Sequence, residues 1–466
     1  MASHESQYRR APVITYELPS IWRTDDPKTR LDTFGEVTTI PAAMKLIATF
    51  LALVSLSAAA PRSNLDHDEA SKRATWPDGP FVTSGRWILN VSGQNLTYAG
   101  TNWPGHNDVM IPEGLQYQPI ETIVEKVKSL GMNTVRLTFA IQMIDEIYSN
   151  GGRDITIQQA FVQALGQANG MRVLNQVLAK NPRFNASTTR LQVFDAVAEE
   201  LAKQQLYIHL DNHISKGMWC CSGNDGNTWW GDTHFSTPNW VRGLAYMAEH
   251  GKSWPALMSI GLRNEPREPS NNAALRATYN WQSWYTYMRQ GADAVNKANP
   301  DLLIFLSGLN YDTYLTPVVQ GTALTPGNGR FSFNDFPGYA DKLVLELHNY
   351  ETGIGNCNSL TGNLYRNGFE ALTSSARNQF PVMLTEFGFL MDDRTWRGVY
   401  ASCLASYLPA QKAGWTIWVL AGSYYIRSGT QDYDETWGLL NHDWSGWRSP
   451  GYVNGALLGM VRNTLN

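Results

Sequence analysis

Two segments, GLRNEP at Gly261–Pro266 and LTEFG at Leu384–Gly388, decide the fold of this chain. Each places a glutamate at the end of a short apolar run, Ala256–Leu262 in the first case and Phe380–Leu384 in the second. Apolar runs of this length are typical of strands buried in a parallel sheet. A closed barrel of such strands brings their carboxyl ends together at one mouth. The two glutamates are therefore predicted to face each other there.

Short apolar runs alternate with helical stretches over most of the chain, as they do in successive βα units. The predicted strands are Tyr98–Asn102, Thr134–Thr138, Leu206–Leu210, Leu257–Leu262, Leu302–Leu306, Leu343–Leu347, Val382–Thr385 and Thr416–Leu420. The predicted helices are Pro119–Leu130, Thr189–Lys203, Asn239–Glu249, Ala273–Ala298, Leu364–Asn378 and Arg394–Leu408. Eight strands with helical crossovers predict the α/β class and a (β/α)8 TIM barrel.

Two further features belong to the predicted barrel. A β-hairpin within Phe81–Gly100 precedes the first strand and is expected to cap the bottom of the barrel. A barrel of this kind takes about 250 residues, so the excess length is expected in long loops at the C-terminal face. These loops span 141–188, 214–237, 308–340 and 421–450. Long loops at that face usually shape the cleft.

The N-terminal region carries the pattern of a targeting segment. A short basic start precedes an apolar stretch that ends in small residues, which is typical of a signal peptide over residues 44–60. Residues 1–43 are then a mis-called or disordered extension, or else the apolar segment is an internal anchor. Lys72-Arg73 is typical of a dibasic cleavage site. Residues 61–73 are therefore predicted to be a propeptide, and 74–466 the mature barrel domain.

Composition and cysteine usage favour a secreted protein. The formal net charge is −4 and charged residues make up 17% of the chain, so neither nucleic acid nor an anionic membrane is an expected partner. Sequons at Asn90, Asn95 and Asn185 and an even number of cysteines fit an extracellular, oxidising compartment. The adjacent Cys220 and Cys221 are expected to pair with distant partners, although all three pairings of the four cysteines remain open.

Polar residues gather at the carboxyl ends of six predicted strands, and their types fit glycoside hydrolysis. This reaction needs a proton donor and a second carboxylate, which attacks the sugar in retaining enzymes. We predict that Glu265 is the acid/base and Glu386 the nucleophile. Arg136 and Tyr350 are expected to keep the nucleophile ionised. The predicted substrate-binding set comprises these two residues together with His213, Asn264, His348, Trp418 and Trp103.

The same segments resemble a known family. RNEP at Arg263–Pro266 resembles the Asn-Glu-Pro signature of the acid/base strand in glycoside hydrolase family five, the cellulase family A, and TEFG at Thr385–Gly388 resembles its nucleophile strand. The match runs from the hairpin near Phe81 to Trp418, and WCCS at Trp219–Ser222 is similar to a branch seen in fungi and plants. The resemblance implies a retaining mechanism without cofactor. It assigns the catalytic roles to the two glutamates, with support from Arg136, His213, Asn264, His348, Tyr350 and Trp418.

The expected protein is a secreted, monomeric hydrolase of a polysaccharide or oligosaccharide. The substrate expected first is a β-glucan, cleaved as by an endo-β-1,4-glucanase. Mannan, or exo-acting cleavage of a glucoconjugate as by a β-glucosidase, remains an alternative, because the long loops decide sugar identity and their shapes are not set by composition.

Two other classes of protein are weighed against this interpretation. The first is a metal-dependent barrel hydrolase that coordinates a metal through His209, Asp211, His213, Glu265 and His348. Arg136 would lie close to that cation, which argues against it. The second is a non-catalytic carbohydrate-binding protein on the same barrel. The presence of both glutamates argues against this class, because a degenerate enzyme usually loses one.

Overall fold

The computed structural model describes residues 76–466. The predicted extension 1–43, signal peptide 44–60 and propeptide 61–73 lie outside these described residues. Among the helices of the described part, none is both long and apolar enough to cross a membrane.

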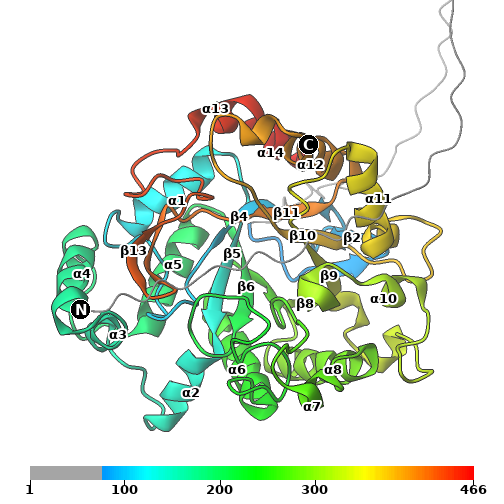
Figure 1. Ribbon diagram of the computed structural model, residues 1–466, viewed down its shortest axis with the longest axis horizontal. Coiled ribbons are helices and arrows are strands. Elements are labelled where there is room, and N and C mark those ends of the chain that lie inside the picture. The colour runs from blue at the N-terminus through cyan, green and yellow to red at the C-terminus, as the bar shows by residue number, and fades with distance from the viewer. Residues whose placement is uncertain (1–75) are drawn as a thin grey trace, which may run out of the picture. The chain divides into compact units, whose positions relative to one another are not determined.

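Eight parallel strands close into a barrel at the centre of the described residues (Figure 1). They are β4 (Ala99–Trp103), β5 (Thr134–Ala140), β6 (Tyr207–Ile214), β7 (Leu257–Gly261), β8 (Leu303–Ser307), β9 (Leu343–Asn349), β10 (Val382–Phe387) and β11 (Gly414–Ile417). Each strand pairs with its neighbour in sequence, and β11 pairs with β4 to close the ring. The predicted TIM barrel and all eight of its strands are confirmed.

Helices surround the barrel, and several differ from the prediction. Between the strands lie α1 (Ile120–Ser129), α5 (Arg190–Lys203), α6 (Thr237–His250), α8 (Trp281–Ala298), α9 (Leu309–Asp312), α10 (Thr316–Gln320), α11 (Cys357–Asn367) and α12 (Val399–Gln411). The helix predicted over Ala273–Ala298 is divided into α7 (Ala273–Arg276) and α8, because the Asn280 side chain caps the start of α8. The helix predicted over Leu364–Asn378 is wrong in position: Asn356 caps α11, and that helix ends before Gly368.

The predicted loop 141–188 is mostly helical, which corrects the sequence interpretation. It contains α2 (Ile141–Ser149), α3 (Ile157–Leu165) and α4 (Gln167–Lys180). Helix α3 begins with a capping box between Thr156 and Gln159, a spacing that could have been found in the sequence. At the other end of the chain, α13 (Pro450–Tyr452) and α14 (Leu458–Leu465) follow the last strand.

A small antiparallel sheet caps the bottom of the barrel, as predicted, but has one strand more than a hairpin. It consists of β1 (Val82–Ser84), β2 (Trp87–Leu89) and β3 (Asn95–Leu96). Phe81 and Ile88 pack in one buried cluster with Tyr98 and Tyr207, which lie where barrel strands begin. The cap therefore seals the N-terminal end and leaves the carboxyl ends of the strands free to form a site.

Both pairs of cysteines form disulfides, and their pairing corrects the expectation. Cys220 and Cys221 are bonded to each other in the loop after β6. Cys357 and Cys403 join the start of α11 to α12, with their Cα atoms 5.5 Å apart. Because α11 and α12 pack side by side, Cys357 and Cys403 are close enough to form a disulfide. No other cysteine is then left to pair with Cys220 or Cys221.

Candidate active site

A pocket of about 310 Å³ opens at the carboxyl ends of the barrel strands. Its walls come from the strand ends, from the loop after β6, and from the hairpin formed by β12 (Ser423–Arg427) and β13 (Thr430–Asp434). The lining residues are His213, Trp219, Cys220, Cys221, Asn264, Glu265, Tyr350, Glu386, Trp418, Arg427, Glu435 and Trp437. Both predicted catalytic glutamates and four of the predicted supporting residues are among them.

Glu265 and Glu386 face each other across this pocket. Glu386 lies within β10, whereas Glu265 follows the end of β7. A carboxylate oxygen of Glu265 and one of Glu386 lie within 4.8 Å of each other. The backbone of Glu265 has a φ of +47°, in the left-handed region that is uncommon for residues other than glycine. Asp312 holds this backbone, because its carboxylate accepts a hydrogen bond of 2.8 Å from the Glu265 N–H.

Arg136 is the cation beside Glu386. Its Nη1 donates to Glu386 Oε1 at 2.7 Å, and its Nη2 lies 3.0 Å from Asp211 and donates to Asn264 at 2.8 Å. The Tyr350 hydroxyl donates to the other oxygen of Glu386 at 2.9 Å. Arg136 is fully buried. Arg136 is not among the residues that line the pocket, and it holds Glu386 and Asn264 in position through these hydrogen bonds.

His348 lies between the two glutamates. Its Nδ1 is 3.0 Å from Glu265 Oε1 and 3.6 Å from Glu386 Oε2. Burial lowers the pKa of His348, and its Nδ1 is placed to form a hydrogen bond with either carboxylate. The residue is nearly fully buried, and it links the glutamates rather than lining the open pocket.

His213 and Trp418 form one side of the pocket floor. Their rings stack with centres 5.4 Å apart, and His213 Nδ1 lies 2.7 Å from Asp211. Trp103, by contrast, is fully buried, and its indole N–H donates to the Glu113 carbonyl at 3.0 Å. Trp103 is not among the residues that line the pocket, and its ring lies 6.5 Å from that of Trp444.

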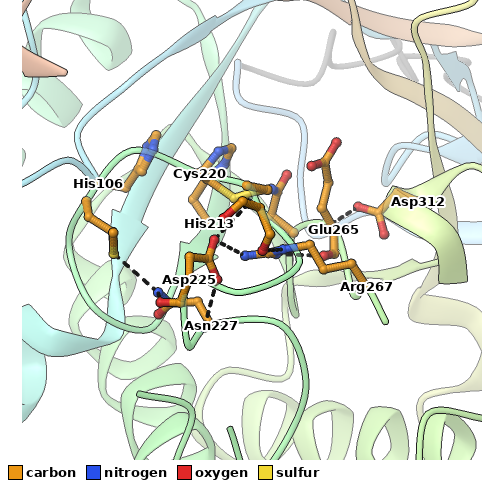
Figure 2. Close-up of a disulfide and its surroundings, with 12 residues drawn as sticks. His106, His213, Cys220, Asp225, Asn227, Glu265, Arg267 and Asp312 are labelled. Atoms are coloured by element: carbon orange, nitrogen blue, oxygen red, sulfur yellow. Dashed lines mark hydrogen bonds and ion pairs between the residues drawn. A yellow bond between two sulfur atoms is a disulfide. The ribbon is translucent and has the colours of Figure 1, made fainter. Parts of the chain in front are cut away.

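Several residues of the site were not predicted. Figure 2 shows a chain of hydrogen bonds in which Arg267 donates to Asp225 at 2.6 Å and to the Glu265 carbonyl at 3.0 Å, next to the bond from Glu265 to Asp312. This chain ties the loop that carries the Cys220–Cys221 disulfide to the segment that carries Glu265. Arg267 follows Glu265 by two residues and could have been noticed, whereas Asp312 lies in a stretch without any regular pattern.

The environments of the two glutamates give them different proton affinities. Burial raises the pKa of Glu265 to about 7, although Arg267 and Arg136 oppose this shift. Burial also raises the pKa of Glu386, and His348, Arg136 and the Tyr350 hydroxyl act in the opposite direction. Because a guanidinium stays charged at every relevant pH, Arg136 is the permanent cation that favours ionised Glu386. Glu265 is thus the carboxyl group that can hold a proton near neutral pH.

The metal site considered in the sequence does not assemble. Among the described residues, two groups could hold an ion, Glu265–His348–Glu386 and Cys220–Cys221–Glu265. Neither contains His209, Asp211 or His213: Asp211 is bound to Arg136 and His213, and His209 contacts Ser259 at 2.9 Å. In the first group a metal would lie beside the Arg136 guanidinium, and in the second the disulfide offers no thiolate. These residues do not fit a metal centre.

Two carboxyl groups this close, one with a pKa raised to about 7 and one beside a permanent cation, are the equipment of a glycoside hydrolase. The family model described as Cellulase (glycosyl hydrolase family 5) matches residues 89–423. A glycosyl hydrolase 5 family protein of Chamaecyparis obtusa is 33% identical over 89% of this chain and 69% of its own length. The chain therefore belongs to glycosyl hydrolase family 5, and it is an enzyme that hydrolyses β-glycosidic bonds of a carbohydrate.

More distant relatives share the fold. An endoglucanase of Paenibacillus polymyxa is 23% identical over 80% of this chain and 85% of its own. The catalytic domain of the major endoglucanase of Xanthomonas campestris superimposes with a TM-score of 0.59 at 20% identity, over 83% of this chain and 99% of that one. An endocellulase of Pyrococcus horikoshii in complex with cellotetraose gives 0.60 at 18% identity, over 82% and 98%.

Proposed function

We propose that this protein is a retaining hydrolase of β-linked glucan, with Glu386 as nucleophile and Glu265 as acid/base. The observation that carries the proposal is the short separation of the two carboxylates, whose oxygens lie within 4.8 Å of each other. Retaining enzymes hold their carboxyl groups about 5–5.5 Å apart, whereas inverting enzymes need about 6.5–9.5 Å to admit a water molecule between acid and base.

The mechanism has two steps. In the first, Glu386 attacks the anomeric carbon while Glu265 gives its proton to the glycosidic oxygen, so the bond to the leaving group breaks and a glycosyl ester forms on Glu386. In the second, ionised Glu265 takes a proton from water, whose oxygen attacks the same carbon and releases Glu386. Arg136 and Tyr350 hold Glu386 ionised and oriented for both steps.

Glucan is proposed as the substrate because the pocket and the relatives agree with it. The stacked rings of His213 and Trp418 offer a flat face on which a pyranose ring can lie, and Asn264 in the pocket can bind a ring hydroxyl. The Paenibacillus polymyxa relative is an endoglucanase, and an endocellulase with the same fold was determined in complex with cellotetraose. A glucan is thus a better first test than mannan, which differs only in the orientation of one hydroxyl.

We also propose that the protein is secreted as a monomer that consists of residues 74–466. The two disulfides support an oxidising compartment. The intact mass and the elution volume of the secreted protein test this proposal. A mature N-terminus far from residue 74, or retention inside the cell, would contradict it.

The decisive experiment on the mechanism is covalent trapping. The secreted enzyme is incubated with 2-fluoro-β-glucosyl fluoride or 2-fluoro-β-cellobiosyl fluoride, and its intact mass and peptide map are measured. We expect one sugar adduct on Glu386 and none on the Glu386→Gln variant. An adduct on another residue would overturn the assignment of the nucleophile. If neither reagent forms an adduct but the corresponding mannosyl reagent labels the enzyme, the sugar of the substrate is mannose and not glucose.

A further inference from the structure

A continuous line of side chains closes one side of the pocket. The guanidinium carbon of Arg427, at the end of β12, lies 3.6 Å from the centre of the Trp219 ring on the loop after β6. Arg427 forms an ion pair with Glu435, which accepts a hydrogen bond of 3.0 Å from the Trp437 N–H. The Trp437 ring lies 5.9 Å from that of Tyr350. These five residues, which we call the pocket wall, all line the pocket.

The β12–β13 hairpin, which carries Arg427 and is followed directly by Glu435, is fixed to the barrel. The Tyr425 N–H donates at 2.7 Å to Glu113, and the Tyr425 hydroxyl donates at 3.0 Å to the Pro112 carbonyl. Tyr424 is fully buried and packs edge-on against Trp219 at 5.3 Å. Because buried hydrogen bonds and aromatic contacts hold both ends of the contact between Arg427 and Trp219, the wall is a built part of the fold.

The pocket wall stands on the side of the nucleophile. Its last member, Tyr350, is bonded to Glu386, and its first, Trp219, lies 6.4 Å from the ring of Trp418 on the pocket floor. Glu265, as the proposed acid, must reach the oxygen that joins the sugar to its leaving group. In the proposed mechanism the leaving group extends past Glu265, and we assign the wall to the other, glycone side, where the non-reducing end of the substrate lies.

We propose that the pocket wall makes this enzyme act at chain ends, releasing short units from the non-reducing ends of β-linked glucans. This inference rests on the proposed function and specifies where along the chain cleavage occurs. A chain that continued past the glycone pocket would have to separate the ion pair of Arg427 and Glu435, whose carboxylate is almost fully buried. The same pair offers donors and acceptors for the hydroxyl groups of a terminal sugar.

The first test uses the wild-type enzyme and cellohexaose that carries a fluorophore at its reducing end. Cleavage from the non-reducing end should release one short unlabelled product, while the labelled fragment shortens in single steps of that size from the earliest time points. A broad mixture of labelled fragments at those times would show internal cleavage and would overturn the proposal, while leaving the proposed function intact. The same stepwise pattern on manno-hexaose would support cleavage at chain ends and would show that the sugar of the substrate is mannose.

Failure of the proposed function gives a different result. In that case neither oligosaccharide is cleaved and no 2-fluoro sugar labels Glu386, so the wall proposal falls together with it. A second readout is the viscosity of carboxymethylcellulose at a given number of bonds broken. If this enzyme cleaves at chain ends, the fall in viscosity per reducing end formed should be at most about one tenth of that produced by an endoglucanase assayed in parallel. An equal reduction would contradict the proposal.

The second test opens the wall. The double variant Trp219→Ala/Arg427→Ala should raise the ratio of internal to terminal cleavage at least fivefold. Trp219→Leu, which keeps apolar bulk on the loop, should raise it about twofold and serves if the double variant does not fold. The matched control is Arg397→Ala, since Arg397 also covers a tryptophan, Trp396, at 4.5 Å but lies outside the pocket. An unchanged ratio in a folded wall variant would overturn the proposal.

Discussion

Glu265 and Glu386 are the same residue type at the same mouth of the barrel, yet their surroundings differ. Glu386 lies within a strand, held by Arg136 on one oxygen and by Tyr350 on the other. Glu265 lies beyond its strand on a left-handed backbone, and its side chain contacts His348. The side chain of Glu265 is 12% exposed and that of Glu386 is 6% exposed. Burial raises the pKa of both carboxyl groups, and what differs between them is the partners: Arg136 and Tyr350 contact Glu386, whereas His348 is the nearest contact of Glu265.

The largest expected effect comes from removing the nucleophile. Glu386→Gln keeps the shape of the side chain but cannot form the glycosyl ester, so kcat should fall by on the order of 10^4-fold or more on every substrate. The rate is measured on a cello-oligosaccharide and on dinitrophenyl β-cellobioside. Near wild-type turnover on either one would sink the assignment of Glu386.

The second expected effect separates the two roles. Glu265→Gln should lose roughly 10^2–10^4-fold on a cello-oligosaccharide, whose leaving group needs a proton. On dinitrophenyl β-cellobioside, whose leaving group needs none, the first step should remain fast and a burst of dinitrophenol should appear. Equal losses on both substrates would mean that Glu265 is not the acid.

The third effect removes the cation that distinguishes the two sites. Arg136→Met leaves Glu386 and Asp211 buried without their charge partner, so the free energy of unfolding should fall by about 3–5 kcal/mol. The pKa of Glu386 should rise further, because its ionised form loses a favourable charge, and the acidic limb of kcat/KM should move to higher pH. Denaturant unfolding and pH profiles measure the two changes, with Arg397→Ala as the exposed control.

The barrel and this pair of glutamates could be predicted because apolar runs and strand-end polar residues are local signals. Asp312 could not: it is one of three consecutive residues with left-handed backbones, and nothing local marks that conformation. The contact of Arg427 with Trp219 depends on how two distant loops pack, which no periodicity records. The full burial of Trp103 could not be predicted, because an aromatic residue at a strand end can face the packing as readily as the cleft.

The pH dependence of the wild-type enzyme is a smaller but sharper test of the comparison. Burial raises the pKa of Glu265 to about 7, so the acid is protonated below that pH and lost above it. On a cello-oligosaccharide kcat/KM should therefore fall about tenfold per unit above pH 7. On dinitrophenyl β-cellobioside this alkaline limb should be absent. If both substrates share the same limb, it belongs to another group.

The smallest effect is expected from the disulfide beside Glu265. The sulfur atoms of Cys220 and Cys221 lie within 4.8 Å of a carboxylate oxygen of Glu265. The variant Cys220→Ser/Cys221→Ser replaces an apolar, polarisable surface with two hydroxyl groups. We expect KM for cello-oligosaccharides to rise a few-fold, while stability changes little because the bond closes no loop of chain.

The second disulfide supplies the matched control, since it lies outside the pocket and spans 46 residues. Cys357→Ser/Cys403→Ser should lower the free energy of unfolding by roughly 3–5 kcal/mol through the freed loop and leave KM unchanged. The two variants therefore move different quantities: one alters binding beside the acid, and the other alters only stability. If KM shifts equally in both variants, the Cys220–Cys221 bond affects binding only through the stability of the fold. The sulfur atoms beside Glu265 would then make no direct contribution to substrate binding.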